Sequence, residues 1–338
     1  MCDIIDMYPL LTNRRFKMIF EKQILNFYKG MAFSRCDDNG TAFYFSANDF
    51  DNLRCEPYSF KSSKGHTLKG YIYSYDGYME DRIIVFDHGF GGGHRSYMKE
   101  IEKLCSHGYR VFAYDHTGCM ESEGENAGGM GQSLCDLNDC INTLKADPRF
   151  ASLDFSVMGH SWGGFSTLNV SALHPEISHI VVFSGFVEVK MLVEAYFAGL
   201  LKPYRKAIMA LESASNPESM KYNAIDSIKK SGVKALLIYS DNDMLCSKKV
   251  HYDALYRGLS DLPNVSFMLE SGKGHNPNYT HSAVKLLDEF VSARNKLTKQ
   301  KKLVSDEQKK SFIASFDWDK MTEQDDRVWS VIFEHLDK

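Results

Sequence analysis

The middle of the chain, from about Tyr58 to Val291, alternates short apolar runs with segments whose apolar residues recur at helical spacing. Several runs are apolar at nearly every position, as strands buried on both faces of a sheet must be. The runs predicted as strands are 67–75, 82–87, 110–115, 154–158, 180–185, 235–240 and 264–269, and the clearest helical segments are 96–108 and 133–148. This alternation predicts an α/β protein whose mostly parallel sheet carries helices on both faces.

Two segments depart from this rhythm. Residues 59–75 have the pattern of an antiparallel hairpin that turns at Lys64-Gly65. Between the runs 180–185 and 235–240, about 50 residues contain no convincing strand, and a structureless loop of that length would be unusual. We therefore expect a helical lid insertion at 187–233. The apolar residues on one broad face of its predicted helix are Met191, Leu192, Tyr196, Phe197, Leu200, Leu201 and Tyr204.

The two flanks have helical patterns of their own. Residues 14–33 repeat apolar side chains at helical spacing, which predicts an arm that packs on the body through Phe16, Phe20, Ile24, Phe27 and Met31. Near the other end, Thr322 and Asp325 stand at capping-box spacing before an apolar stripe. That stripe predicts a terminal helix docked on the core through Val328, Trp329, Ile332, Phe333 and Leu336.

These patterns divide the chain into five parts. We expect an N-terminal helical arm at 1–57, a first part of the core at 58–186, the lid at 187–233, a second part of the core at 234–297 and a C-terminal helical extension at 298–338.

Composition narrows the class of protein. A net charge of −4 over 338 residues argues against a nucleic-acid-binding surface. The eight cysteines are scattered and include no CxxC pair, which is typical of reduced thiols in a cytoplasmic protein. The sequence contains no apolar run of 18 residues, so no membrane span is predicted. The first residues do not resemble a secretory signal. We therefore expect a cytoplasmic protein without stable membrane insertion.

The stretch "FSVMGHSWGGFSTL", residues 155–168, places Ser161 between two glycines at the junction of a strand and a helix. That setting is typical of a nucleophile elbow, in which small neighbours let strand and helix approach closely around a strained serine. The tight turn lifts the hydroxyl clear of the sheet. Ser161 is therefore the candidate nucleophile.

A serine hydroxyl needs a base to take its proton and an acid to orient that base. In this kind of fold both follow the serine along the chain, acid first. His275 ends "GKGH" after the last predicted strand, so it is the candidate base, whereas His281 falls on the following helix. For the acid we favour Asp243 over Asp241, because Asp243 lies beyond the turn and Asp241 is placed to hold the turn itself.

An acyl-transfer site also needs hydrogen-bond donors where negative charge develops on the substrate oxygen. One should be the backbone N–H of Trp162, directly after the serine. The second should come from the loop "HGFGGG" at 88–93, where Phe90 is favoured and Gly91 is the alternative. His88 is expected to brace this loop.

With these motifs in place, the chain resembles a serine hydrolase of the α/β-hydrolase superfamily, in the group of monoacylglycerol lipase-like and serine aminopeptidase-like enzymes. The resemblance rests on "DHGFGGG", "YDHTGCMESEG", "GHSWGG", "YSDND" and "GKGH", in family order. It implies an eight-stranded sheet with the lid between the sixth and seventh strands. Ser240 departs from the pattern, since such proteins usually carry glycine there.

The predicted activity is hydrolysis of carboxylic esters of small or medium acyl groups through an acyl-enzyme, without metal or organic cofactor. Ser161 would attack the ester, His275 would transfer protons and Asp243 would orient His275. Tyr196 and Phe197 are expected to line the substrate pocket with Phe90 and Trp162.

Other activities remain open at this point. An aminopeptidase would need acids such as Glu188 or Glu194 to hold the substrate ammonium. A thioesterase or an acyltransferase would use the same chemistry. A non-catalytic binding protein on a hydrolase scaffold is the alternative from another class. The expected partner is a small-molecule ester, and the sequence does not predict an oligomeric state.

Overall fold

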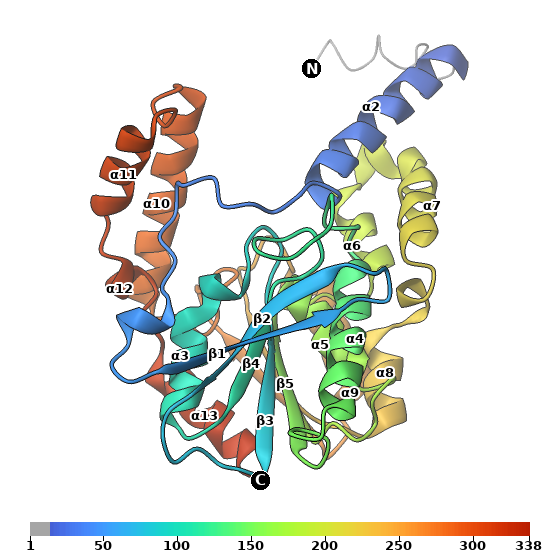
Figure 1. Ribbon diagram of the computed structural model, residues 1–338. Coiled ribbons are helices and arrows are strands. Elements are labelled where there is room, and N and C mark those ends of the chain that lie inside the picture. Colours follow the sequence, from blue (N-terminus) through green and yellow to red (C-terminus); the bar gives the residue numbers. More distant parts are fainter. Residues whose placement is uncertain (1–13) are drawn as a thin grey trace.

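The computed structural model describes residues 14–338, in which eight strands form one sheet in the order β1-β2-β4-β3-β5-β6-β7-β8 (Figure 1). The strands are β1 (Arg54–Lys61), β2 (Thr67–Ser74), β3 (Arg82–Asp87), β4 (Val111–Tyr114), β5 (Asp154–His160), β6 (His179–Phe183), β7 (Lys234–Ser240) and β8 (Val265–Glu270). β1 and β2 form the expected hairpin, β2 pairs antiparallel with β4, and the remaining neighbours are parallel. The predicted mostly parallel α/β sheet is confirmed.

Helices cover both faces of this sheet (Figure 1). The α-helices are α2 (Arg14–Ala32), α3 (Met98–Ser106), α4 (Gln132–Ala146), α5 (Trp162–Val170), α6 (Val189–Tyr196), α7 (Arg205–Ser215), α8 (Ala224–Ser231), α9 (Asp253–Leu259), α10 (His281–Lys299), α11 (Asp306–Ala314), α12 (Trp318–Met321) and α13 (Asp326–Leu336). Shorter turns are η1 (Ala47–Asp49), η2 (His94–Tyr97), η3 (Gly199–Tyr204), η4 (Ser219–Lys221) and η5 (Lys248–Tyr252). None of the helices within residues 14–338 is both long and apolar enough to span a bilayer.

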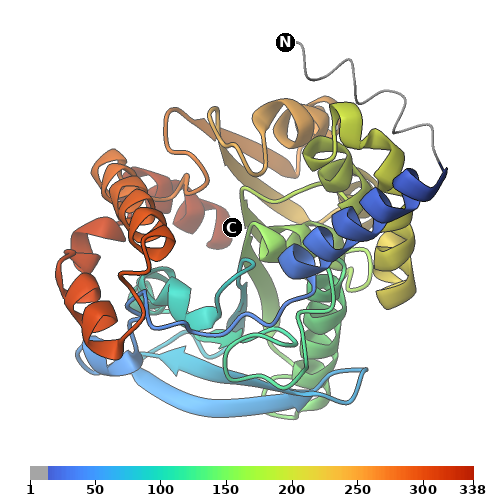
Figure 2. The same ribbon diagram turned by 90° about the horizontal axis from the view of Figure 1, so that it is seen from above.

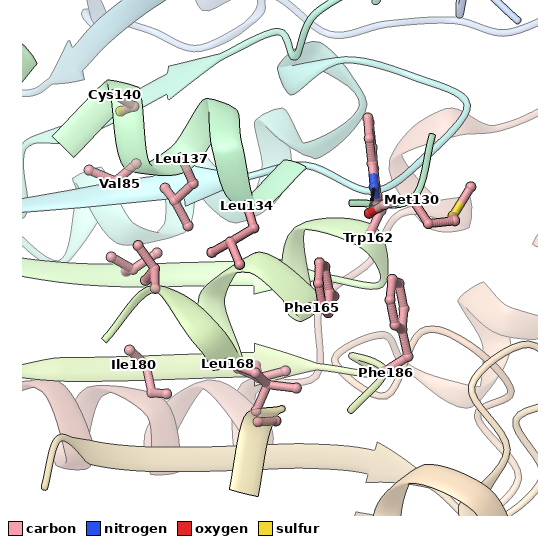
Figure 3. Close-up of a cluster of buried hydrophobic side chains, with 14 of the residues drawn as sticks. Val85, Met130, Leu134, Leu137, Cys140, Trp162, Phe165, Leu168, Ile180 and Phe186 are labelled. Atoms are coloured by element: carbon pink, nitrogen blue, oxygen red, sulfur yellow. Dashed lines mark hydrogen bonds between the residues drawn. The ribbon is translucent and has the colours of Figure 1, made fainter. Parts of the chain in front are cut away.

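The larger core lies between the sheet and the helices α4 and α5. Figure 3 shows Leu134 and Leu137 of α4 and Phe165 of α5 packed over the strands, with Val85 and Ile180 among their neighbours. All five side chains are buried. Their burial fixes α5 against the sheet, and α5 begins directly after Ser161.

The opposite face is covered by α3 and α13. The predicted docking of the terminal helix is confirmed, since Trp329 and Ile332 are buried in the same cluster as Phe86. The predicted cap is wrong in detail: Asp325 itself caps α13 by accepting the Arg327 N–H. Thr322 instead ends α12 by donating to the Trp318 carbonyl. An aspartate beside the first turn satisfies its free N–H groups without a distant partner.

The lid insertion is not one continuous helix. α6 ends at Tyr196, and the chain passes through η3 before α7 begins. Gly199 has φ 58°, a conformation that favours glycine, and Pro203 lies inside η3. The single apolar face expected from residue 191 to 204 is therefore divided, and Leu200 is 64% exposed.

The expected lid extends to residue 233, but α8 belongs with the sheet. Ile228 of α8 is buried in the larger core, and Ser227 donates to Asn169 at 2.9 Å. Asn169 belongs to α5, so α8 covers the sheet and not the site.

The N-terminal arm forms the predicted helix but presents a different stripe to the body. Phe27 is 64% exposed and Met31 36% exposed, whereas Tyr28 and Ala32 are buried. The Tyr28 ring packs against Phe197 of the lid with centroids 5.8 Å apart. In Figure 2, α2 lies beside the lid helices, above the carboxyl ends of the strands. The side chain of Phe16 lies outside the part of the chain whose burial is described.

The arm is joined to the lid by a buried hydrogen-bonded carboxylate. Glu212 of α7 accepts the Tyr28 hydroxyl at 2.6 Å and the backbone N–H groups of Met130 and Gly131 at 3.0 and 3.3 Å. Burial raises the pKa of Glu212, against the effect of these donors. The arm, the lid and the loop before α4 therefore meet at one side chain.

We expect Glu212→Ala to lower the free energy of unfolding by about 3 kcal/mol, because it leaves three buried donors without an acceptor. Tyr28→Phe should cost about 1 kcal/mol, since it removes one donor and leaves the acceptor other partners. Urea denaturation followed by circular dichroism measures both. Equal effects of the two changes would contradict this account of the contact.

Candidate active site

Ser161 occupies the sharp turn from β5 into α5. Its backbone has φ 57° and ψ −108°, a strained conformation for a residue with a side chain. A methyl group on Gly163 would lie 2.0 Å from the Asp87 carbonyl oxygen, and one on Gly159 would lie 2.3 Å from the Gly163 carbonyl oxygen. Glycine at both positions is what allows strand and helix to meet around the serine.

His275 and Asp243 come together on the loops after β8 and β7. The His275 Nδ1 lies 2.7 Å from an Asp243 carboxylate oxygen, and the other oxygen accepts the N–H groups of Leu245 and Cys246 at 2.8 and 3.0 Å. Asp243 is buried, which by itself raises its pKa. The hydrogen bond and charge of His275 and the two N–H groups outweigh burial, so the pKa of Asp243 is lowered.

Asp241 serves a different set of contacts. Its exposed carboxylate accepts the Ser271 hydroxyl and the Gly272 N–H, both at 2.9 Å. The Gly272 N–H and then the Ser271 hydroxyl lower the pKa of Asp241. Asp241, directly after β7, therefore binds the turn that follows β8, whereas Asp243 binds His275.

The two proposed oxyanion donors lie on the same side of the sheet. The Phe90 and Trp162 rings pack edge to face with centroids 5.0 Å apart. Among residues 14–338, neither the backbone N–H of Phe90 nor that of Trp162 donates a hydrogen bond, whereas the Trp162 indole N–H donates to the Met130 carbonyl at 2.8 Å. Both donors are therefore available to a substrate oxygen.

Buried polar contacts brace the glycine loop. His88 accepts the His116 N–H at 2.9 Å on Nε2 and contacts the Gly89 carbonyl at 2.8 Å through Nδ1. Burial first, and then the charge of His116, lowers the pKa of His88 to about 3. Asp115 accepts the His94 N–H at 2.8 Å at the end of the loop.

These groups surround a cavity of about 340 Å³. Ser161, His275, Phe90, Trp162, Tyr196 and Phe197, all named from the sequence, line it. The sequence did not indicate the other lining residues, which are Tyr28, Met31, Gly89, Tyr97, Met130, His160, Phe186, Leu192, Val193, Leu245 and Cys246. Met31 and Leu192 were named only as parts of the arm and lid faces. Gly89 and His160 lie within the motifs "HGFGGG" and "GHSWGG", and the remaining seven residues carry no local motif.

No carboxylate side chain lies among the described residues that line this cavity. Glu188 accepts the Asn223 side-chain amide at 3.0 Å outside it, and Glu194 is exposed. Residues 14–338 also contain no group of three His, Cys, Asp or Glu side chains arranged to hold a metal ion.

The family described as serine aminopeptidase, S33 matches residues 79–267, more than half of the 338-residue chain. Among curated proteins, none gives a significant match.

Three solved structures share the fold. The esterase Pf2001 of Pyrococcus furiosus is 18% identical with a TM-score of 0.56, over 77% of this chain and 96% of its own. A protein titled hypothetical protein PA2218, from Pseudomonas aeruginosa, is 14% identical with a TM-score of 0.55, over 75% of this chain and 95% of its own. The α/β hydrolase GrgF of Penicillium sp. sh18 is 15% identical with a TM-score of 0.51, over 73% of this chain and 99% of its own.

Proposed function

This chain belongs to the serine aminopeptidase S33 family of α/β-hydrolases, and we propose that it cleaves carboxylic esters of small or medium acyl groups through an acyl-enzyme intermediate. The observation that carries the proposal is the Asp243–His275 pair, 2.7 Å apart, with His275 on the wall of the cavity that also contains Ser161. An oriented imidazole and an activated serine in one cavity are what acyl transfer requires.

In the proposed reaction the Ser161 hydroxyl attacks the ester carbonyl while His275 Nε2 takes its proton. The N–H groups of Phe90 and Trp162 receive the developing oxyanion. His275 then protonates the leaving alcohol, and a water molecule repeats the sequence on the acyl-enzyme. Asp243 holds the proton of His275 on Nδ1 and stabilises the imidazolium.

The cavity favours an ester over an amino-acid amide. A free amino terminus carries a positive charge, and holding it needs a nearby carboxylate, yet no carboxylate side chain among the described residues lines the cavity. Apolar side chains such as Phe186, Val193 and Phe197 suit an uncharged acyl chain, which binds by burial. The family description favours an aminopeptidase, which is therefore the second candidate.

Labelling and turnover together test the proposal. A fluorophosphonate probe should label the wild-type protein and not Ser161→Ala. A panel of p-nitrophenyl esters of rising chain length, a thioester and amino-acid p-nitroanilides should show the highest kcat/KM for uncharged esters. Preference for the anilides would establish the aminopeptidase, and absence of labelling would mean a binding protein on a hydrolase scaffold.

The lid residue Phe197 should set how well longer acyl chains bind. Its side chain is buried on the cavity wall, so Phe197→Ala removes apolar surface at the acyl site. Each buried methylene contributes about 0.8 kcal/mol. We expect kcat/KM for hexanoate to fall about tenfold while acetate changes less than about twofold.

Leu200 provides a matched control, because it is in the same lid, is 64% exposed and does not line the cavity. Leu200→Ala should leave the chain-length profile unchanged. Since Phe197 also packs on Tyr28, both variants need thermal melts. An equal loss for acetate and hexanoate would show that Phe197 supports the fold and not the acyl chain.

A further inference from the structure

Three consecutive hydrogen bonds link residues that line the cavity into one hydrogen-bonded chain. The Gly89 N–H donates to the Tyr97 hydroxyl oxygen at 3.0 Å. The same hydroxyl lies 2.8 Å from His160 Nδ1, and His160 Nε2 lies 2.8 Å from the carbonyl oxygen of His275. None of these three bonds enters the proposed reaction described above.

The donors and acceptors fix the direction of the chain. A carbonyl oxygen can only accept, so His160 Nε2 must carry a proton. Burial first, and then the charge of His275, lowers the pKa of His160 to about 3, so the ring is neutral and holds no second proton. Nδ1 is then an acceptor, and the Tyr97 O–H must donate to it. All three bonds run from Gly89 to His275.

Each end of the chain holds part of the proposed machinery. Gly89 directly precedes Phe90, whose N–H is a proposed oxyanion donor, and the terminal carbonyl belongs to the proposed base itself. His160 directly precedes Ser161. These three hydrogen bonds therefore join the oxyanion loop, the nucleophile turn and the histidine loop, which are far apart in sequence.

Close packing constrains Gly89 and His160. A methyl group on Gly89 would lie 2.5 Å from the Tyr97 hydroxyl oxygen and 3.3 Å from His160 Nδ1, so glycine is needed for the first bond. The His160 and His275 rings lie 4.6 Å apart. A neutral His160 can stay at that distance when His275 gains a proton, whereas a charged one would repel it.

We propose that Tyr97 and His160 are positioning residues that act as one unit, holding the oxyanion loop and His275 in register around Ser161. The proposal rests on the proposed hydrolase reaction and adds two residues to it. Because the unit transmits position through consecutive bonds, loss of either link should have the same consequence as loss of both.

Tyr97→Phe, His160→Asn and the double variant test this. Phenylalanine removes the hydroxyl, and asparagine can still accept from Tyr97 but does not reach the His275 carbonyl. We expect each single change to lower kcat for p-nitrophenyl acetate about tenfold with little change in KM. A loss of about tenfold is what one buried hydrogen bond contributes when it acts only in the transition state. The double variant should also lose about tenfold. A loss of about a hundredfold, the product of the two, would overturn the proposal.

Two further variants separate positioning from general stability. His160→Gln can donate an amide N–H towards the His275 carbonyl and should retain more activity than His160→Asn. Tyr109→Phe removes the hydroxyl of another tyrosine, which donates a part-buried hydrogen bond to Asp337 at 2.6 Å far from the site, and it should leave kcat unchanged. Equal activity of the Gln and Asn variants, or a tenfold loss in Tyr109→Phe, would contradict the proposal.

A measurement on the unmodified protein does not depend on the variants folding. Nitrogen-15 NMR of histidine-labelled protein should find His160 neutral with its proton on Nε2, and a proton on Nδ1 would overturn the proposal. Fluorophosphonate labelling of the wild type is measured first. If labelling fails, the proposed function is wrong. If labelling succeeds but the double variant loses the product of the two single losses, only the positioning unit is rejected.

Discussion

Ser161→Ala and His275→Ala should each lower kcat for ester hydrolysis by a factor on the order of 10⁴ or more, with the fold intact. Alanine at 161 removes only the hydroxyl, whose attack on the carbonyl would begin the reaction. Alanine at 275 removes the base, and the side chain it replaces is only partly buried, so little packing is lost. Initial rates with p-nitrophenyl acetate, alongside thermal melts, give both quantities.

His281→Ala is the matched control for the histidine. His281 begins α10 and contacts the Ser271 carbonyl at 2.8 Å, on an exposed part of the surface. Activity of this variant should stay close to that of the wild type. Near-normal ester turnover by a folded Ser161→Ala protein would end the nucleophile assignment, and a severe loss in His281→Ala would reopen the choice of base.

Asp243→Asn should lower kcat by a factor on the order of 10⁴, because the histidine would be held with its proton on the wrong nitrogen. One Asp243 carboxylate oxygen accepts the Leu245 and Cys246 N–H groups, and this fixes the other oxygen towards His275. An asparagine that keeps these two bonds must point its amide NH₂ at His275 Nδ1. The imidazole would then carry its proton on Nε2 and could not accept one from Ser161.

Asp241→Asn provides the comparison two residues away. Its carboxylate holds only Ser271 and Gly272 on the exposed turn, so we expect kcat to change by no more than a few-fold. The two variants are assayed across pH, since the deficit of Asp243→Asn should persist at every pH where the protein is folded. A larger loss in Asp241→Asn would reverse the assignment of the acid.

The sequence determined the architecture and the order of the candidate residues because both depend on local rules. Solidly apolar runs separated by helical patterns can be satisfied only by a covered parallel sheet. The glycines around Ser161 are required because a methyl group there would lie only 2.0 to 2.3 Å from backbone atoms of the same turn or the adjacent strand. The turn after β7 likewise points the Asp241 and Asp243 side chains in different directions, so only Asp243 can reach the histidine.

The tertiary structure decided the shape of the pocket and the contacts that hold it. Tyr28 enters the cavity from an arm expected to pack through Phe27 and Met31, because its hydroxyl meets Glu212, 184 positions further along the chain. The helical spacing of the arm allows several orientations, and the one it takes is held by distant contacts of Tyr28, the hydrogen bond to Glu212 and the packing on Phe197.

The same holds for the bonds that join the loops. No sequence motif indicates that Tyr97 and His160 hold the site together. Their hydrogen bonds form only once β3, β5 and the loop after β8 lie side by side. Local sequence fixes backbone geometry over a few residues, where steric limits are strict. Which side chains face one another across a site depends on packing between segments far apart in sequence, and that is settled only when the whole core closes.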